Sequence, residues 1–72
     1  MNDWETAIDH LRRNGWKVRW FSYVSRTGQS VWRASGIKAE QPVVTIESDF
    51  LPEAILGLAR ACDAREALSK RG

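Results

Sequence analysis

The sequence is poor in the residues that carry most metal and redox chemistry. Of its 72 residues one is a cysteine, Cys62, and one is a histidine, His10. A single cysteine excludes an internal disulfide, and this pair cannot supply the usual four cysteine and histidine ligands of a structural zinc site. We therefore expect a fold that is held together by packing, with no metal and no cofactor.

Long apolar runs and a large net charge are also missing. No stretch approaches the roughly 20 apolar residues of a membrane-spanning helix, and no basic segment followed by an apolar run opens the chain. The formal net charge is only +2, which makes a weak field for attracting nucleic acid. Together with a lone thiol, these features predict a soluble protein of the reducing cytoplasm with no membrane partner.

Tryptophan, in contrast, is abundant. The four tryptophans supply large apolar areas to a chain so short that its packing is marginal. The apolar fraction of 43% and the charged fraction of 28% are those of a folded globule. At this length we expect one domain over residues 1–72.

Side-chain periodicity predicts the order helix, strand, strand, strand, helix. An apolar stripe at helical spacing opens the chain, and Gly15 suits the left-handed position after a helix. Consecutive strands this close together pair as an antiparallel meander. The expected fold class is therefore α+β, with both helices packed on one face of a three-stranded sheet. The expected ranges are a helix over about 3–14, strands over about 16–26, 31–37 and 43–47, and a helix over about 50–69.

The first expected strand carries aromatic residues on both faces. Its even positions hold Trp16, Trp20 and two valines. Its odd positions hold two basic residues followed by Phe21 and Tyr23. Side chains alternate across a strand, and two helices cover only one face of a small sheet. We take the uncharged even face as the core, so the odd face is open.

The register between the first two strands depends on the turn that joins them. A three-residue turn over 27–29 pairs Val24 with Trp32 and places Trp32 in the core. A two-residue turn would reverse the parity and place Trp32 beside Tyr23. On the first register the expected core is Trp4, Ile8, Leu11, Val18, Trp20, Val24, Trp32, Val44, Ile46, Leu51, Ile55, Leu58 and Cys62.

No set of residues in the sequence predicts catalysis. His10 follows Asp9, but adjacent helical residues do not face each other. Cys62 lies on an apolar helical stripe, with nothing cationic placed to lower its pKa. The acids near the second helix are explained by capping and by the helix dipole: Glu47, Asp49 and Glu53. We expect no enzyme, no catalytic residue and no small-molecule substrate.

The open face is the candidate binding site, and three interpretations of it compete. It could be a solvated face on which basic stems cover two aromatics, or a protein interface, including a face-to-face homodimer. It could also bind single-stranded nucleic acid, with bases stacked on the aromatics. We favour a small non-enzymatic interaction protein that binds a protein partner or itself, with nucleic-acid binding as the alternative. The expected partner-binding residues are Lys17, Arg19, Phe21, Tyr23 and Arg33.

The order helix, three strands, helix resembles the double-stranded-RNA-binding domain, whose size is similar. That family opens its second helix with lysines that grip phosphates, whereas the segment 49–54 here is acidic and apolar. The resemblance therefore implies the topology and not the activity. The junction of segments 44–47 and 52–55 is similar to the strand–helix junction of HicB-type antitoxins. Small tryptophan-rich chains of this kind also resemble phage-encoded accessory proteins.

Overall fold

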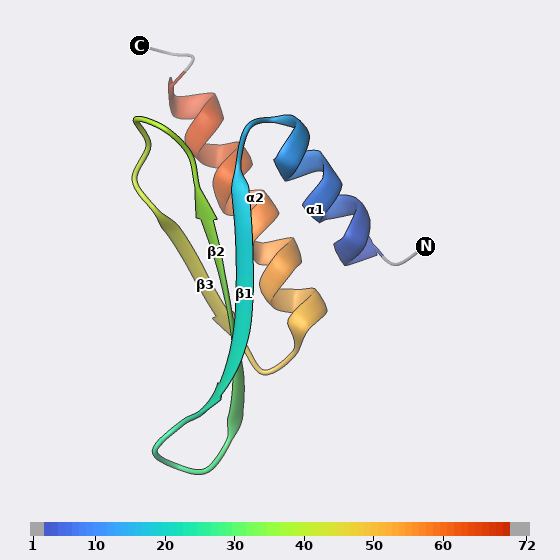
Figure 1. The fold of residues 1–72 in the computed structure, drawn as a ribbon, viewed down its shortest axis with the longest axis vertical. Coiled ribbons are helices and arrows are strands. Elements are labelled where there is room, and N and C mark those ends of the chain that lie inside the picture. The colour runs from blue at the N-terminus through green and yellow to red at the C-terminus, as the bar shows by residue number, and fades with distance from the viewer. Residues whose placement is uncertain (1–2, 70–72) are drawn as a thin grey trace.

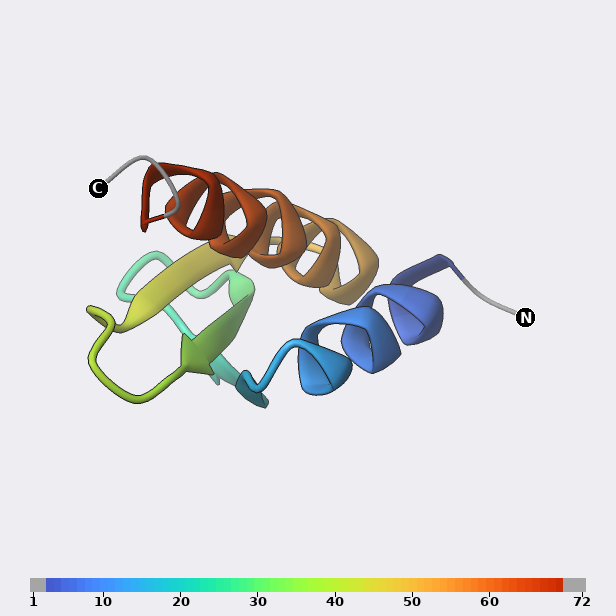
Figure 2. The same ribbon diagram turned by 90° about the horizontal axis from the view of Figure 1, so that it is seen from above.

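The chain folds into two layers, a sheet and a pair of helices that cover one of its faces (Figure 1). The computed structural model describes residues 3–69. The sheet is antiparallel with the strand order β1-β2-β3, and both helices lie on the same side of it (Figure 2). This architecture confirms the predicted α+β class. The elements are α1 (Asp3–Arg13), β1 (Lys17–Val24), β2 (Ser30–Ile37), β3 (Val44–Ser48) and α2 (Leu51–Ser69).

The end of α1 determines where β1 begins. The backbone N–H of Gly15 donates to the carbonyl of Arg12, and that of Trp16 donates to the carbonyl of Leu11. This pair of hydrogen bonds is a Schellman cap, in which Gly15 takes the expected left-handed conformation with φ of 91°. The cap turns the chain so that Trp16 enters the core beside Leu11.

The β1–β2 hairpin has the predicted parity but a different register. Ser22 lies opposite Trp32, and Val24 lies opposite Ser30, so five residues, 25–29, form the loop. The register expected from a three-residue turn at 27–29 was therefore wrong by two positions, because Val24 lies opposite Ser30 and not Trp32. A shift of two keeps each side chain on its predicted face, and Trp32 still packs against the core.

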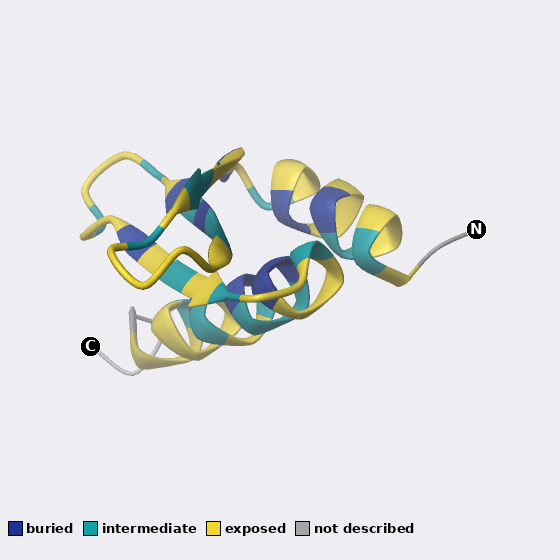
Figure 3. Cartoon of the chain, turned by 90° about the horizontal axis from the view of Figure 1, so that it is seen from below, coloured by how far each residue is buried: buried dark blue, intermediate teal, exposed yellow. Residues whose placement is uncertain are grey.

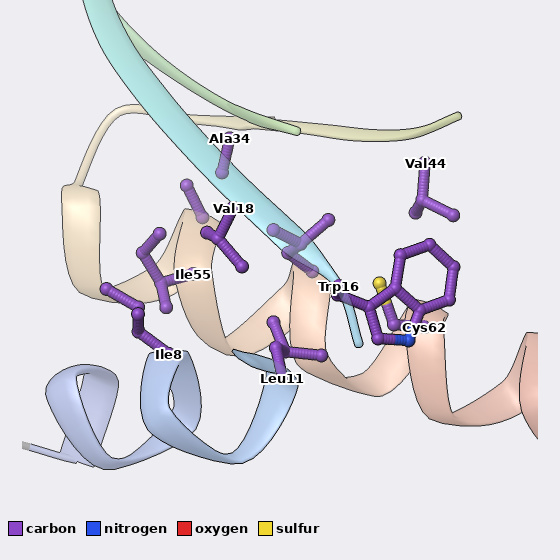
Figure 4. Close-up of a cluster of buried hydrophobic side chains, with 10 residues drawn as sticks. Ile8, Leu11, Trp16, Val18, Ala34, Val44, Ile55 and Cys62 are labelled. Carbon is purple, nitrogen blue, oxygen red and sulfur yellow. The ribbon is translucent and has the colours of Figure 1, made fainter. Parts of the chain in front are cut away.

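One apolar core fills the space between the layers (Figure 3). Trp16 and Cys62 lie together at one end of this cluster, and Ile8 and Ile55 lie at the other (Figure 4). Seven of the 13 predicted core residues are buried as expected. The buried members of the core are Ile8, Leu11, Trp16, Val18, Ala34, Val44, Ala54, Ile55, Leu58 and Cys62.

Four more predicted core residues pack at the rim of this core and stay partly exposed: Trp4, Trp32, Ile46 and Leu51. The last two, Trp20 and Val24, contradict the prediction: their side chains are 36% and 68% exposed. Both lie on the helix-covered side of β1, as expected, but the β1–β2 hairpin extends past the N-terminal ends of the helices (Figure 1). Trp20 makes an edge-on contact with Trp4, with ring centroids 6.4 Å apart.

Trp16 lies on the even side that was taken as the core, although the expected core residues did not include it, and polar contacts satisfy its buried indole. Its indole Nε1 donates to Glu66 Oε1 at 3.0 Å. Lys38 Nζ lies 2.7 Å from the same oxygen and 5.7 Å from the centroid of the Trp16 ring. One carboxylate of α2 thus satisfies the buried indole and holds the β2–β3 loop.

The start of α2 is fixed by Ser48 at the end of β3. Its Oγ accepts a hydrogen bond from the backbone N–H of Phe50 and donates one to Glu53 Oε2 at 2.9 Å. Gly57, further along the helix, faces Ile46 so closely that an added Cβ would lie 3.2 Å from Ile46 Cγ2. This is the close approach to the sheet that a helical glycine predicts. No helix within residues 3–69 is both long and apolar enough to span a membrane.

Candidate interaction surface

All five predicted partner-binding residues lie on the face of the sheet that the helices leave uncovered. We call this surface the open face. Four of its residues alternate along β1, and Arg33 of β2 lies directly opposite Phe21. Their role in binding stays a prediction, whereas their common face is a feature of the structure. The five are Lys17, Arg19, Phe21, Tyr23 and Arg33.

An aromatic pair with an arginine above it forms one end of the open face. The Phe21 and Tyr23 rings lie with their centroids 6.2 Å apart. The guanidinium carbon of Arg33 lies 5.8 Å from the Phe21 centroid and 5.2 Å from the Tyr23 centroid. Both distances are within the range of cation–π attraction. Although Phe21 is 49% exposed, its position is therefore defined by its neighbours.

Glu47 of β3 completes this cluster. Its Oε2 accepts hydrogen bonds from Arg33 Nη2 at 3.1 Å and Nε at 3.3 Å, and also from the Tyr23 hydroxyl. We call these four residues, Phe21, Tyr23, Arg33 and Glu47, the aromatic cluster. Because its one cation and one anion are paired, the cluster presents apolar rings with little net charge.

The pKa values within the cluster reflect these contacts. The hydrogen bond to Glu47 raises the pKa of Tyr23 above the ordinary tyrosine value. The same hydrogen bond, with smaller contributions from Arg33, lowers the pKa of Glu47 below the ordinary glutamate value. At neutral pH the cluster therefore holds a neutral phenol, a carboxylate and a guanidinium.

The other end of the open face is basic. Lys17 and Arg19 lie at the start of β1, opposite Ile37 and Ser35 of β2. Both side chains are exposed, and Ile37 beside them is 38% exposed. The open face thus runs from a basic end to a charge-compensated aromatic end.

Glu47 is the member of the open face that the sequence analysis assigned wrongly. Its place in the third strand was predicted correctly, but its carboxylate was explained, together with Asp49 and Glu53, by capping and the dipole of the second helix. The signal that could have identified it is parity: Val44 and Ile46 belong to the core, so Glu47 points to the other side. The capping contacts come from Ser48 instead.

His10 also has a partner that the sequence did not reveal. Its Nε2 lies 3.0 Å from Asp63 Oδ1, which joins α1 to α2, and Asn14 Nδ2 lies 3.4 Å from the same nitrogen. The side chains of His10 and Asp63 are each about half exposed. The contact joins the two helices on the outer surface of the protein.

A shallow open depression lies beside the basic end of the open face. Its volume is about 380 Å³, and two lysines line it, of which Lys38 is already paired with Glu66. None of its lining residues is a histidine, cysteine or acid that could act as a base or a nucleophile. The lining residues are Gly15, Lys17, Ile37, Lys38 and Ala39.

Residues 3–69 contain no group of three or more histidine, cysteine, aspartate or glutamate side chains that could hold a metal ion. Comparison with known proteins finds no matching family model, no similar curated protein and no similar solved structure.

Proposed function

We propose that the protein is a small, non-enzymatic interaction module that binds a protein partner through the open face. The observation that favours this function most is the aromatic cluster. Aromatic residues and arginine are the types enriched at protein interfaces, and anchors with fixed positions lose little entropy on binding. Here Arg33 is held over two rings and by Glu47 before any partner arrives.

The charges of the open face favour a protein over a nucleic acid. A single strand would need its phosphates held by Lys17, Arg19 and Arg33 while its bases stack on the rings. Arg33, however, is already paired with Glu47, whose carboxylate would repel a phosphate. Only two unpaired cations of the predicted site remain, and they lie at the far end from the aromatic cluster.

A photocrosslinking experiment tests the proposal. A benzophenone amino acid replaces Thr45, which is exposed on β3 two residues before Glu47. Thr45 is not a member of the aromatic cluster. The matched control carries the same amino acid at Arg60, which is exposed on α2 in the other layer. In the native host, position 45 should yield a discrete protein adduct that position 60 does not.

The adduct should disappear when Phe21→Ala is combined with the crosslinker at position 45, because an aromatic anchor contributes about 2 kcal/mol or more to an interface. Circular dichroism should show that this variant remains folded, since Phe21 is half exposed. Equal adducts from positions 45 and 60, or adducts that survive Phe21→Ala, would contradict the proposed site.

Nucleic-acid binding is the alternative, and a titration with single-stranded and double-stranded oligonucleotides at two salt concentrations tests it. Contacts from Lys17, Arg19 and Arg33 would give a logarithmic salt slope of about −2, at roughly −0.7 for each neutralised phosphate on a single strand. We expect no micromolar binding at physiological salt. Binding that is present there and lost in Phe21→Ala would replace the protein partner with a nucleic acid.

A further inference from the structure

The outer edge of β1 is the least protected part of the described sheet. β1 is an edge strand, since it pairs only with β2. Natural edge strands are usually blunted by charges, prolines or bulges. Lys17 and Arg19 protect the first half of β1, but its second half, Trp20 to Val24, has none of these features. Three of its side chains are large, apolar and exposed: Trp20, Phe21 and Val24.

The backbone groups along this edge are available for pairing at even-numbered residues. The pairing of Val24 with Ser30 continues into the loop at Ser25 and Gln29, where the N–H of Ser25 donates to the carbonyl of Gln29, so this next pair is a hydrogen-bonded one. Because such pairs alternate along an antiparallel ladder, the odd residues of β1 bond to β2. The N–H and C=O groups of Trp20, Ser22 and Val24 therefore point outward from the sheet.

We propose that a second copy of the chain pairs with this edge, so that two β1 strands join in an antiparallel arrangement about a two-fold axis at Ser22. A two-fold axis brings the same segment to both sides of the interface. The axis is perpendicular to the sheet, so the two sheets form one continuous sheet of both copies. All four helices lie on one side of it, and both open faces lie on the other.

The side chains of the segment are complementary to themselves in this register alone. Trp20 lies opposite Val24 of the second copy, and Phe21 lies opposite Tyr23 of the second copy. Each exposed apolar residue thus meets another, and aromatic cross-strand pairs are among the stabilising ones. Moving the axis by one residue would place Trp20 opposite Ser22 or Arg26. It would also require pairing through the odd-numbered backbone groups, which already bond to β2.

The charges near the edge also fit a second copy. No charged residue lies within 20–24, and Arg19 lies opposite Ser25 of the second copy, so no like charges oppose each other. In this register Arg26 falls opposite Val18 of the second copy, on the side of that copy's sheet where α1 packs. The exposed side chains of Asp3, Glu5 and Asp9 make the first part of that helix acidic.

This inference does not rest on the proposed function, because the edge leaves the open face uncovered. The test uses the full chain and measures its mass by light scattering after size exclusion, over micromolar to millimolar concentrations. The expected mass is twice 8.2 kDa at the upper end. Ser22→Lys and Ser22→Asp should each return the mass to 8.2 kDa, because opposed residues of a hydrogen-bonded pair lie only about 5.5 Å apart at their Cα atoms.

An equimolar mixture of the two variants should recover the doubled mass, since a lysine then faces an aspartate across the axis. The matched control is Thr45→Lys, which places the same charge on an exposed position of β3 and should leave the dimer intact. Circular dichroism checks that each variant is folded, which the exposure of Ser22 favours. A monomeric wild-type chain at millimolar concentration, a dimer that survives Ser22→Lys, or a mixture that stays monomeric would each overturn the proposal.

Discussion

Trp16 and Trp20 share one side of the chain yet differ greatly in burial, with exposed fractions of 2% and 36%. Trp16→Ala should lower the free energy of unfolding by about 3–5 kcal/mol, the range for deleting a buried aromatic side chain. Trp20→Ala should cost clearly less, because its main neighbour is the rim residue Trp4. Urea titrations followed by circular dichroism measure both, in a Ser22→Lys background so that self-association does not enter. A larger loss for Trp20→Ala would contradict the arrangement of the core.

Alternation predicted the face of each β1 residue correctly, but it could not predict how much of that face is covered. Trp20 and Val24 point to the helix side as their even numbers require, and they stay exposed because the helices end short of them. Trp16 precedes β1, so its burial depends on the Schellman cap and on Glu66, which lies 50 residues away in the chain. Contacts of that separation leave no periodic pattern in a sequence.

The acid titration of Glu47 offers a test of the aromatic cluster. A carboxyl whose folded pKa is lowered stabilises the folded state above its unfolded pKa, and this contribution is lost as the pH falls through the folded pKa. Tyr23→Phe removes the hydrogen bond that lowers the Glu47 pKa most, so that pKa should rise toward the ordinary glutamate value. A carbon-13 NMR titration of the Glu47 carboxyl measures the shift. Thr45→Val, its neighbour on β3, should leave the midpoint unchanged, and an unchanged midpoint in Tyr23→Phe would show that the hydroxyl contact is absent.

At the scale of elements, the distance between β2 and α2 is set by a glycine. A Cβ added to Gly36 would lie 3.0 Å from Cys62 Sγ and 3.3 Å from Trp16 Cε3. Gly36→Ala should therefore destabilise the fold by about 1–3 kcal/mol through overpacking. In a Cys62→Ala background, which removes the sulfur, the same change should cost markedly less. A double-mutant cycle from urea titrations gives this coupling, and purely additive losses would contradict the close contact.

The elements themselves were predictable because each has a local cause. The apolar stripe and Gly15 define α1, and the alternating strands and Ser48 define the path into α2. The hairpin register was not predictable to the residue, since loops of three and five residues give the same parity. The two-residue difference decides which residue of β2 lies opposite each residue of β1.

At the scale of the whole molecule, the described chain is thin, with principal extents of 43 × 29 × 15 Å. One core joins every element, and Cys62 lies within it with no exposed surface. The sequence predicted the burial of this thiol from its place on the apolar stripe. It could not predict that Gly36 and Trp16 would both lie against it, because those contacts join three separate elements.

Cys62 should therefore report the opening of the whole fold. Burial, followed by the charges of Asp63 and Glu66, raises its pKa to about 11. At pH 8 the folded protein then holds about one thousandth of the thiol as thiolate, against roughly a quarter for an ordinary cysteine.

Because α2 must also leave the sheet before a reagent can reach the sulfur, alkylation by iodoacetamide should proceed through the unfolded state, at a rate set by the free energy of unfolding. Trp16→Phe should accelerate labelling about tenfold for each 1.4 kcal/mol of stability that it removes, whereas Arg60→Ala on the exposed side of α2 should have little effect. Labelling followed by mass spectrometry measures these rates. A labelling rate that does not change with the free energy of unfolding of the variant would mean that α2 opens locally, without the rest of the core.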